Sequence, residues 1–277
     1  MKYIDLFCGI GSFHYSFRKL GFECVMACDI NSNARDTYEY NYGLSPLQSI
    51  CDILPDDVKS YDILCAGFPC QAFSQCGKQK GFQDDRGNLF FHILKFLDVH
   101  HPRFVVLENV PSLKTHDKGR TFDIIMTHLS QAGYEIQYSV LKCSDYGIPQ
   151  MRKRLFIIGI RKDIFSPNTD ILDLSHYHKT TTLSQYLGKD FRKDTAYTIR
   201  CGGRGSHIDN RHNWDSYYLQ DGTVYSLTIQ DAQKLQGFDT SFKLIGSKTS
   251  QWKLLGNTIP TIFTHMIGQK IRDYIHD

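Results

Sequence analysis

Cys70 is the strongest candidate for a reactive side chain in this sequence. It lies in GFPCQAFS, positions 67–74, directly after a proline and before a glycine-rich loop. An inert cysteine would more naturally lie inside a strand, as we expect for Cys65, whereas Cys70 follows the end of one. A thiol with a reference pKa of about 8.5 is only a few per cent thiolate near neutral pH, yet it is intrinsically very nucleophilic and needs modest activation. We therefore predict that Cys70 is a nucleophile.

Two further segments carry side chains suited to binding a polar ring. LENV at 107–110 places Glu108 at the end of an apolar run, on the same edge as Cys70 if the two strands are neighbours. A partly desolvated carboxyl there could stay protonated and donate to a ring nitrogen. QMRKR at 150–154 sets Arg152 and Arg154 two residues apart, hence on one side of an extended chain. Such arginines anchor a carbonyl or a phosphate, although a solvated basic run is the alternative.

Glycines and aspartates in the first quarter of the chain favour a nucleoside-bearing cofactor. DLFCGIG at 5–11 puts glycines directly after the first strand, where the backbone can approach a ligand, but it lacks the third glycine of a dinucleotide fingerprint. Asp29 follows the second strand, and Asp52 follows SIC, which we take as a further strand. A carboxylate after the second strand accepts hydrogen bonds from ribose hydroxyls in doubly wound folds. Helix N-capping is the alternative role for both aspartates.

Zinc is a competing explanation for the cysteines. Cys65, Cys70 and Cys76 lack the paired C-x-x-C spacing and a matching second pair, so we expect no metal. Nine cysteines with irregular spacing in 277 residues are typical of reduced thiols in a cytosol-like compartment.

A parallel sheet would bring these residues together. Apolar runs at 3–7, 23–27, 61–66 and 104–108 alternate with helical stretches, including 12–20 and 89–101. This alternation predicts an α/β, doubly wound, Rossmann-like sheet that is covered by helices on both faces and binds ligands at the carboxyl ends of its strands. The runs at 135–141 and 154–160 have no helix between them, so we expect them to pair antiparallel and finish the sheet.

Composition is that of an ordinary folded protein, with 41% hydrophobic and 22% charged residues. No apolar run approaches the roughly 18 to 20 residues of a membrane span, and the N-terminal sequence reaches Asp5 before a signal-peptide core could form. The net charge of +3 neither demands nor forbids a nucleic-acid partner.

The chain becomes polar after about Lys162 and regains an apolar pattern from Leu227. We expect a catalytic and cofactor-binding domain at 1–162, a small domain at 163–245, and a segment at 246–277 that returns to the first domain.

The motifs occur in an order that resembles one enzyme family. DLFCGIGSF, GFPCQAFSQCGKQKGFQDDRGNLF, ENV, QMRKR and LGNTIP together resemble the cytosine-5 DNA methyltransferases of bacterial restriction-modification systems. The matches cover most of the chain outside about 162–222, and PCQ followed by ENV is highly specific. Asp29 stands where the family more often has glutamate, and Phe68 stands for a common proline.

The resemblance implies that S-adenosylmethionine methylates C5 of a cytosine flipped out of double-stranded DNA, after Cys70 attacks C6 of the ring. It implies a cytosine site formed by Cys70, Glu108, Arg152 and Arg154, with no metal. It implies a cofactor site formed by Phe7, Gly9, Gly11, Asp29, Ile30, Asp52, Ile53, Pro69 and Asn257. The loop at 71–88 is the candidate lid over the flipped nucleotide, with Gln71, Ser74, Lys78 and Lys80 as DNA contacts.

The polar segment is then the target-recognition domain, and TIRCGGRGSHIDNRHNW at 198–214 is its most suggestive part. Arg200, Arg204 and Arg211 lie among glycines that permit close backbone approach. Arginine pairs bidentately with guanine O6 and N7, so we expect Arg204 above all to read the DNA sequence. An ordinary glycine-rich turn with solvated arginines is the alternative.

Three other functions are less consistent with the sequence. RNA cytosine methylation is disfavoured by the long variable segment and by the absence of a Cys-Phe-Thr tripeptide. A catalytically silent DNA-binding subunit would need neither Cys70 nor Glu108. Adenine methylation would call for an Asn/Asp-Pro-Pro-Tyr/Phe element where this chain has GFPC.

We expect a monomer that acts on DNA in the bacterial cytoplasm, in association with the nucleoid, and not at a membrane.

Overall fold

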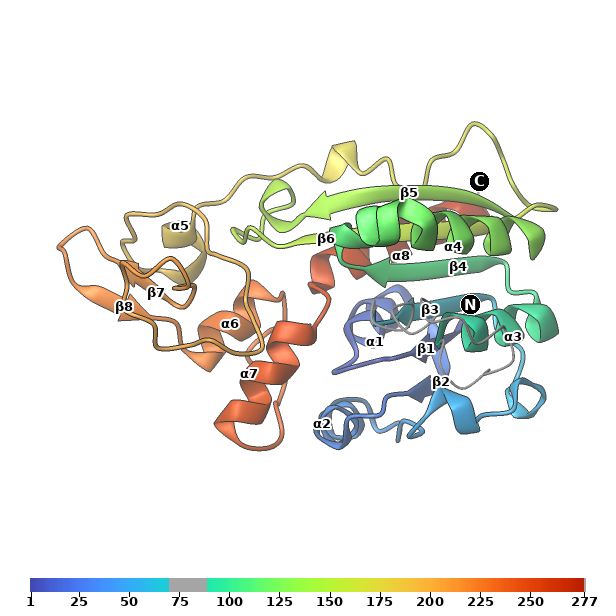
Figure 1. Ribbon diagram of the computed structural model, residues 1–277, viewed down its shortest axis with the longest axis horizontal. Helices are drawn as coiled ribbons and strands as arrows, with labels where there is room; N and C mark the ends of the chain where they lie inside the picture. Colours follow the sequence, from blue (N-terminus) through green and yellow to red (C-terminus); the bar gives the residue numbers. More distant parts are fainter. Residues whose placement is uncertain (70–88, 277) are drawn as a thin grey trace.

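The computed structural model describes residues 1–69 and 89–276, and its centre is a six-stranded sheet in the order β2-β1-β3-β4-β6-β5 (Figure 1). The strands are β1 Lys2–Leu6, β2 Glu23–Cys28, β3 Ile63–Gly67, β4 Phe104–Asn109, β5 Tyr134–Lys142 and β6 Lys153–Arg161. The first four are parallel, and β6 pairs antiparallel with both β4 and β5. The predicted α/β sheet and its antiparallel closing pair are therefore confirmed.

Helices cover both faces of this sheet. They are α1 Ser12–Phe17, α2 Ser32–Tyr42, α3 Leu89–His100, α4 Arg120–Gln131 and α8 Thr261–His276. The buried apolar side chains form two large cores. Helices α1 and α8 pack together in one of them, and α3 and α4 contribute to the other. Alternate residues of β4 supply the two cores, with Phe104 and Val106 in the first and Val105 and Leu107 in the second. Sequence analysis missed α4, although its buried apolar residues recur at helical spacing.

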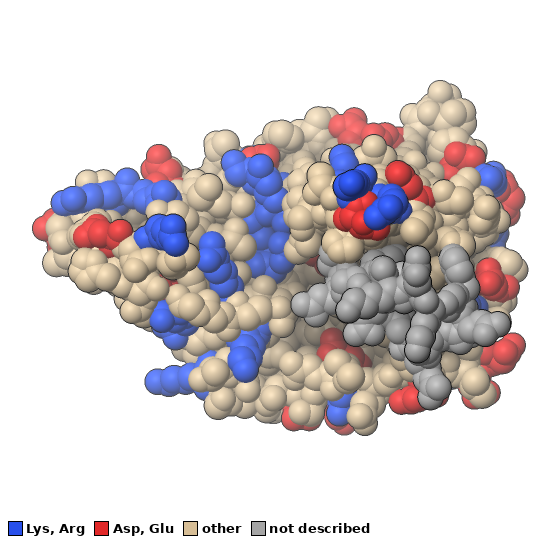
Figure 2. Space-filling view, viewed as in Figure 1, with Lys and Arg blue, Asp and Glu red and all other residues tan. Residues whose placement is uncertain are grey.

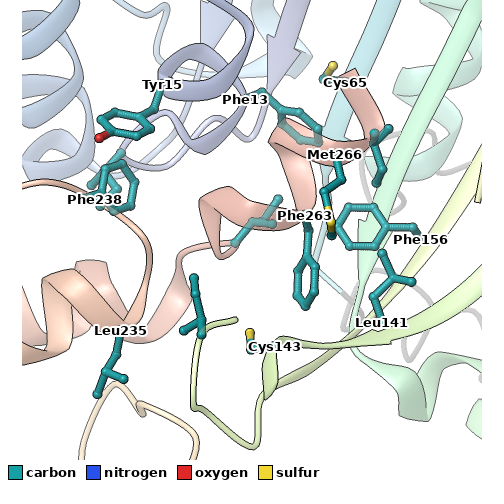
Figure 3. Close-up of a cluster of buried hydrophobic side chains, with 14 of the residues drawn as sticks. Phe13, Tyr15, Cys65, Leu141, Cys143, Phe156, Leu235, Phe238, Phe263 and Met266 are labelled. Carbon is teal, nitrogen blue, oxygen red and sulfur yellow. The ribbon is translucent and has the colours of Figure 1, made fainter. Parts of the chain in front are cut away.

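Aromatic side chains dominate the core beneath α8. Figure 3 shows Phe263 and Met266 of α8 beside Phe156 of β6, with Phe13 of α1 nearby. The rings of Phe156 and Phe263 meet edge to face with centroids 5.7 Å apart, a favoured aromatic geometry. This packing returns the end of the chain to the first helix and so closes the fold.

A smaller lobe lies beside the sheet (Figure 1). It contains α5 Leu183–Leu187, β7 Ser216–Tyr218, β8 Val224–Ser226 and α6 Ile229–Leu235. Helix α7, Lys248–Asn257, packs against α6 of this lobe and against α2 of the larger part, so it lies between the two. None of the helices in the described ranges is long and apolar enough to span a membrane.

The expected strand before Asp52 is wrong. Residues Ile50–Asp52 form a short 3-10 turn, in which the Ser49 side chain accepts a hydrogen bond from the amide of Cys51 at 3.2 Å. The nearest pairing with β2 is an isolated bridge between Leu47 and Cys28. Three residues are too few to hold a ladder once a local cap competes for the backbone.

Asp5 is a carboxyl group buried within the sheet. It is 1% exposed, and its Oδ2 has no hydrogen-bond partner among the described residues. Burial, with the nearby charge of Asp29 as a smaller cause, raises the pKa of Asp5 well above its ordinary value. The folded state therefore keeps a proton that the unfolded chain releases near pH 4. Between that pH and the higher pKa of the folded state, the free energy of unfolding falls as pH rises.

We expect Asp5→Asn, which removes this titration, to become more stable relative to the wild type as pH rises. Across the window the difference in the free energy of unfolding should grow by about 1.4 kcal/mol per pH unit. Urea unfolding at pH 5 and pH 8 measures it, with the exposed Asp36→Asn as control. A difference that does not change with pH would show that Asp5 is not held neutral.

Candidate active site

The candidate site forms where β3 and β4 end side by side. Gly67, the last residue of β3, is in register with Glu108 of β4. The Nδ2 group of Asn109 donates to the carbonyl of Phe68 at 2.8 Å, so the chain leaving β3 stays against β4. The expectation that these two strands are neighbours is confirmed. Cys70 itself lies outside the described residues, as do Gln71, Ser74, Lys78 and Lys80.

Cys65 has the inert position that was expected for it. It lies inside β3 and is fully buried. Burial raises the pKa of its thiol well above the ordinary value, so this sulfur stays protonated.

Glu108 and Arg154 form an ion pair at the edge of the sheet. The Arg154 Nε lies 2.7 Å from Glu108 Oε1, and the two side chains are only 14% and 10% exposed. Burial raises the pKa of Glu108, and the charges of Arg154 and Arg152 oppose this without cancelling it. Arg154 also donates to the carbonyl of Lys153 at 2.8 Å, which fixes its orientation. The pair therefore presents a desolvated carboxyl beside an ordered guanidinium.

Arg152 has a different environment from the one we expected. It is 1% exposed, and its Nη atoms donate to the carbonyls of Ile199, Gly256 and Thr258 at 2.8 to 2.9 Å. Main-chain carbonyls therefore occupy its Nη donors, and the expected contact of Arg152 with a base or a phosphate stays a prediction. The sequence motif could not distinguish the environments of Arg152 and Arg154, since both residues lie in the same basic run.

Asp29 joins the glycine loop to the start of α2. Its Oδ2 accepts from the amide of Gly9 and its Oδ1 from the amide of Asn31, both at 2.8 Å. The capping residue of α2 is Asn31, whose side chain accepts from Ala34, so the N-cap alternative for Asp29 is wrong. Burial raises the pKa of Asp29, and the two amide donors act against that shift.

The glycines of the loop after β1 have different roles. Both Gly9 and Gly11 have positive φ values, 55° and 83°. A Cβ at Gly9 would have no atom within 4 Å, whereas a Cβ at Gly11 would lie 2.4 Å from the ring of Tyr42 and 2.8 Å from that of Tyr38. The backbone at Gly9 is therefore open on its Cβ side, and Gly11 leaves space for the tyrosines.

The remaining cofactor candidates lie on several segments. Phe7 has a left-handed backbone, φ 57°, at the end of β1. Ile30 is 79% exposed, Asp52 and Pro69 are exposed, and Ile53 is half-buried. Asn257 ends α7, and its Oδ1 accepts from the thiol of Cys201 at 2.8 Å.

Ser12, missed by sequence analysis, places the segment after Asn257 near the glycine loop. Its hydroxyl donates to the carbonyl of Ile259 at 2.6 Å. The side chain of Ile259 in turn lies 3.4 Å from the Cβ position of Gly67. The NTIP segment therefore lies between the glycine loop and the end of β3. A serine after GIG is the signal that the sequence offered, but its partner is 247 residues away.

The three candidate DNA-reading arginines differ in their freedom. The Arg204 Nε lies 3.3 Å from Asp215 Oδ2, and its guanidinium lies over the Trp252 ring, 3.9 Å from the centroid. These contacts favour a structural role for Arg204 over base reading. Arg200, Arg204 and Arg211 are all exposed, so a role of each in reading the DNA stays a prediction. On the face shown in Figure 2, Lys and Arg side chains gather along the hollow between the small lobe and the sheet.

A family model described as C-5 cytosine-specific DNA methylase matches residues 1–218. The chain belongs to this family. It is therefore a DNA cytosine-5-methyltransferase, as the motifs indicated.

Curated relatives of the methylase match along nearly its whole length. Type II methyltransferase M.HaeII of Haemophilus aegyptius is 45% identical, covering 93% of this chain and 88% of the relative. Type II methyltransferase M.DsaV of Dactylococcopsis salina is 34% identical, covering 99% of this chain and 87% of the relative.

Solved structures share the fold of the methylase. The S. pombe Dnmt2 methyltransferase superposes with a TM-score of 0.77 at 19% identity, and 99% of each chain is covered. A putative DNA modification methyltransferase encoded within an E. coli prophage gives 0.76 at 20% identity, with both chains fully covered. At these identities the likeness concerns the fold alone.

We expect Gly11→Ala to destabilise the methylase by about 2 to 4 kcal/mol, because a buried clash adds to an unfavourable backbone conformation. Gly43→Ala is the matched control, since Gly43 also has a positive φ, 69°, but a Cβ there meets nothing within 4 Å. It should cost about 1 kcal/mol. Urea unfolding of both variants measures the difference, and equal losses would refute the packing role of Gly11.

Proposed function

We propose that this methylase transfers a methyl group from S-adenosylmethionine to C5 of a cytosine flipped out of double-stranded DNA, through a covalent adduct with Cys70. The observation that carries the proposal is the register of Gly67 with Glu108, since β3 leads within three residues to Cys70. The Type II methyltransferases among its relatives support a role as the modification enzyme of a restriction-modification system. Such an enzyme acts in the bacterial cytoplasm, on nucleoid DNA.

The loop after β1 and the end of β2 fit S-adenosylmethionine. Open space at Gly9 admits a ligand close to the backbone, and Asp29 keeps acceptor capacity for ribose hydroxyls because a carboxylate has about four lone-pair sites. The exposed side chain of Ile30 offers an apolar surface to the adenine ring. We assign Phe7, Asp52, Ile53, Pro69 and Asn257 to the rest of this site by resemblance to the family. When bound, the cofactor supplies an electrophilic methyl group.

The protein must make the cytosine ring more reactive, because C5 is too weak a nucleophile on its own. The Cys70 thiolate bonds to C6, and the electron pair of the C5–C6 double bond moves to C5. After C5 gains the methyl group, a base removes the C5 proton, the electron pair re-forms the double bond and the C6–S bond breaks. The ring regains its aromatic form, and the thiolate is restored.

Glu108 and Arg154 stabilise the ring while electron density accumulates. A protonated Glu108 donates to N3 and accepts from the 4-amino group, and Arg154 donates to O2. Burial favours the protonated carboxyl, as the raised pKa of Glu108 indicates. The ion pair holds both groups in place before the base arrives, so little reorganisation is needed.

DNA must reach this site with one base out of the stack, at a cost of a few kcal/mol. We propose that the small lobe recognises the sequence, with Arg200 and Arg211 among its DNA contacts. The division into domains at 1–162, 163–245 and 246–277, the lid at 71–88 and the monomeric state remain predictions.

Substitution of the aspartates tests the cofactor site. We expect Asp29→Ala and Asp52→Ala each to weaken S-adenosylmethionine binding by about 1 to 3 kcal/mol, the value of a hydrogen bond to a charged group. Calorimetric titration measures the affinity, with the exposed Asp57→Ala as control. If both variants bind as tightly as the wild type, the nucleoside lies elsewhere.

Cys70→Ala tests the chemistry. It should abolish methyl transfer but change cofactor affinity by no more than a few fold, because the thiol acts on the base. Wild-type protein should form a denaturation-resistant adduct with DNA containing 5-fluorocytosine, in which fluorine blocks the elimination step, and Cys70→Ala should form none. Turnover by the purified variant, free of wild-type enzyme, would disprove covalent catalysis by Cys70.

A further inference from the structure

Three buried polar side chains form a junction between the sheet and the small lobe. They are Gln150 and Arg152, which lie just before β6, and Gln236, which follows α6. Gln150 and Gln236 are fully buried, and Arg152 is 1% exposed. Buried groups of this kind must find partners, so their hydrogen bonds report which segments the fold holds together.

The partners of the junction come from three distant parts of the chain. Gln150 Oε1 accepts from the amide of Ile199 at 3.1 Å, and its Nε2 donates to the carbonyl of Leu235 at 2.6 Å. Gln236 Nε2 donates to the carbonyl of Leu255. The entry to β6 is thus bonded to the recognition segment near 199, and the ends of α6 and α7 complete the junction.

Arg152 is the central member of this junction. It donates to the carbonyl of Ile199, directly before Arg200, and to the carbonyls of Gly256 and Thr258, on either side of Asn257. One guanidinium therefore bonds to the recognition segment and to the segment that holds a cofactor candidate. Two residues further along the same chain, Arg154 pairs with Glu108.

The recognition segment also packs tightly against the end of α7. A Cβ added to Gly256 would lie 2.4 Å from the amide nitrogen of Cys201 and 2.5 Å from the carbonyl carbon of Arg200. The thiol of Cys201 donates to Asn257 Oδ1 at 2.8 Å. The position of Arg200 is therefore fixed from both sides.

The buried positive charge of Arg152 opposes movement of the segment at 199–201. Burial lowers the pKa of Arg152, and its Nε has no hydrogen-bond partner among the described residues, so the cation depends on its Nη bonds to carbonyls. If the segment at 199–201 moved away, a buried charge would lose a hydrogen bond, and such losses are costly.

We propose that Arg152 is a positioning residue that fixes the recognition segment 199–201 relative to the Glu108–Arg154 pair, so that the choice of DNA site and the chemistry on cytosine are coupled. The inference rests on the proposed function. It gives Arg152 a role in specificity without contact with the base.

Arg152→Met tests this coupling, and Arg152→Lys tests whether charge alone is enough. Both should bind S-adenosylmethionine within about threefold of the wild type. We expect kcat to fall about 100-fold, the usual penalty for misplaced reacting groups, and methylation mapped by bisulfite sequencing to spread to additional sites. Lysine should not restore the wild-type map, because an ammonium lacks the planar fork that reaches three carbonyls. The exposed Arg120→Met, which loses an ion pair with Asp117, is the control.

Gly256→Ala provides an independent test. It leaves the Arg152 side chain in place but displaces Arg200 and Cys201 by steric contact. Alanine suits the helical backbone at this position, so the cost comes from the contact with Arg200 and Cys201, and the site map of the folded protein should broaden in the same way. For every variant, the fraction of protein molecules that form the 5-fluorocytosine adduct measures how much of the preparation is active.

If activity falls only in proportion to that fraction while the site map stays wild-type, Arg152 merely stabilises the fold and the inference is overturned. An unchanged map and rate in both Arg152→Met and Gly256→Ala would overturn it equally. If the wild type itself forms no adduct and methylates no cytosine, the proposed function is overturned and the inference falls with it.

Discussion

The burial of one guanidinium, that of Arg152, is the constraint on which the arrangement of the two parts depends. A fully desolvated cation is stable only if several acceptors surround it, and here these acceptors are carbonyls of Ile199, Gly256 and Thr258. Because they belong to segments far apart in sequence, the chain must bring the segment near Ile199 and the end of α7 to the start of β6. The glycine at 256 is a consequence, since any Cβ there would displace the recognition segment.

Desolvation and the charge of a neighbouring arginine act on Glu108 in opposite directions. Desolvation raises the pKa of Glu108 and so favours a neutral, donating carboxyl, whereas the paired Arg154 favours the carboxylate. The effect of burial on the pKa of Glu108 is the larger one, and the charge of Arg154 reduces it without cancelling it. A base that offers a ring nitrogen and an exocyclic carbonyl would satisfy both groups at once, which is how the proposed cytosine site uses the pair.

Local sequence was sufficient for the sheet and insufficient for side-chain partners. Alternating apolar runs and the break between 141 and 154 predicted the four parallel strands and the antiparallel pair, because both patterns are local. The strand expected before Asp52 was wrong because a three-residue stretch carries too little pattern to distinguish a strand from a turn. The contacts of Arg152 and Arg204 could not be predicted for another reason: their partners Gly256 and Trp252 are 104 and 48 residues away, a distance that no spacing rule covers. The hydrogen bond of Ser12 to Ile259, 247 residues away, was likewise beyond any local pattern.

Charge balance around Glu108 explains why two arginines accompany one carboxyl. Arg152 and Arg154 both act electrostatically on Glu108, so this buried region carries one net positive charge while the carboxyl is ionised and two when it is protonated. In water such an excess would matter little, but at low dielectric it favours any anion that enters. The proposed chemistry begins with a thiolate and proceeds through an electron-rich ring, so both would be stabilised relative to their neutral forms. Arg152 thus acts electrostatically on Glu108 even though its hydrogen bonds are all directed elsewhere.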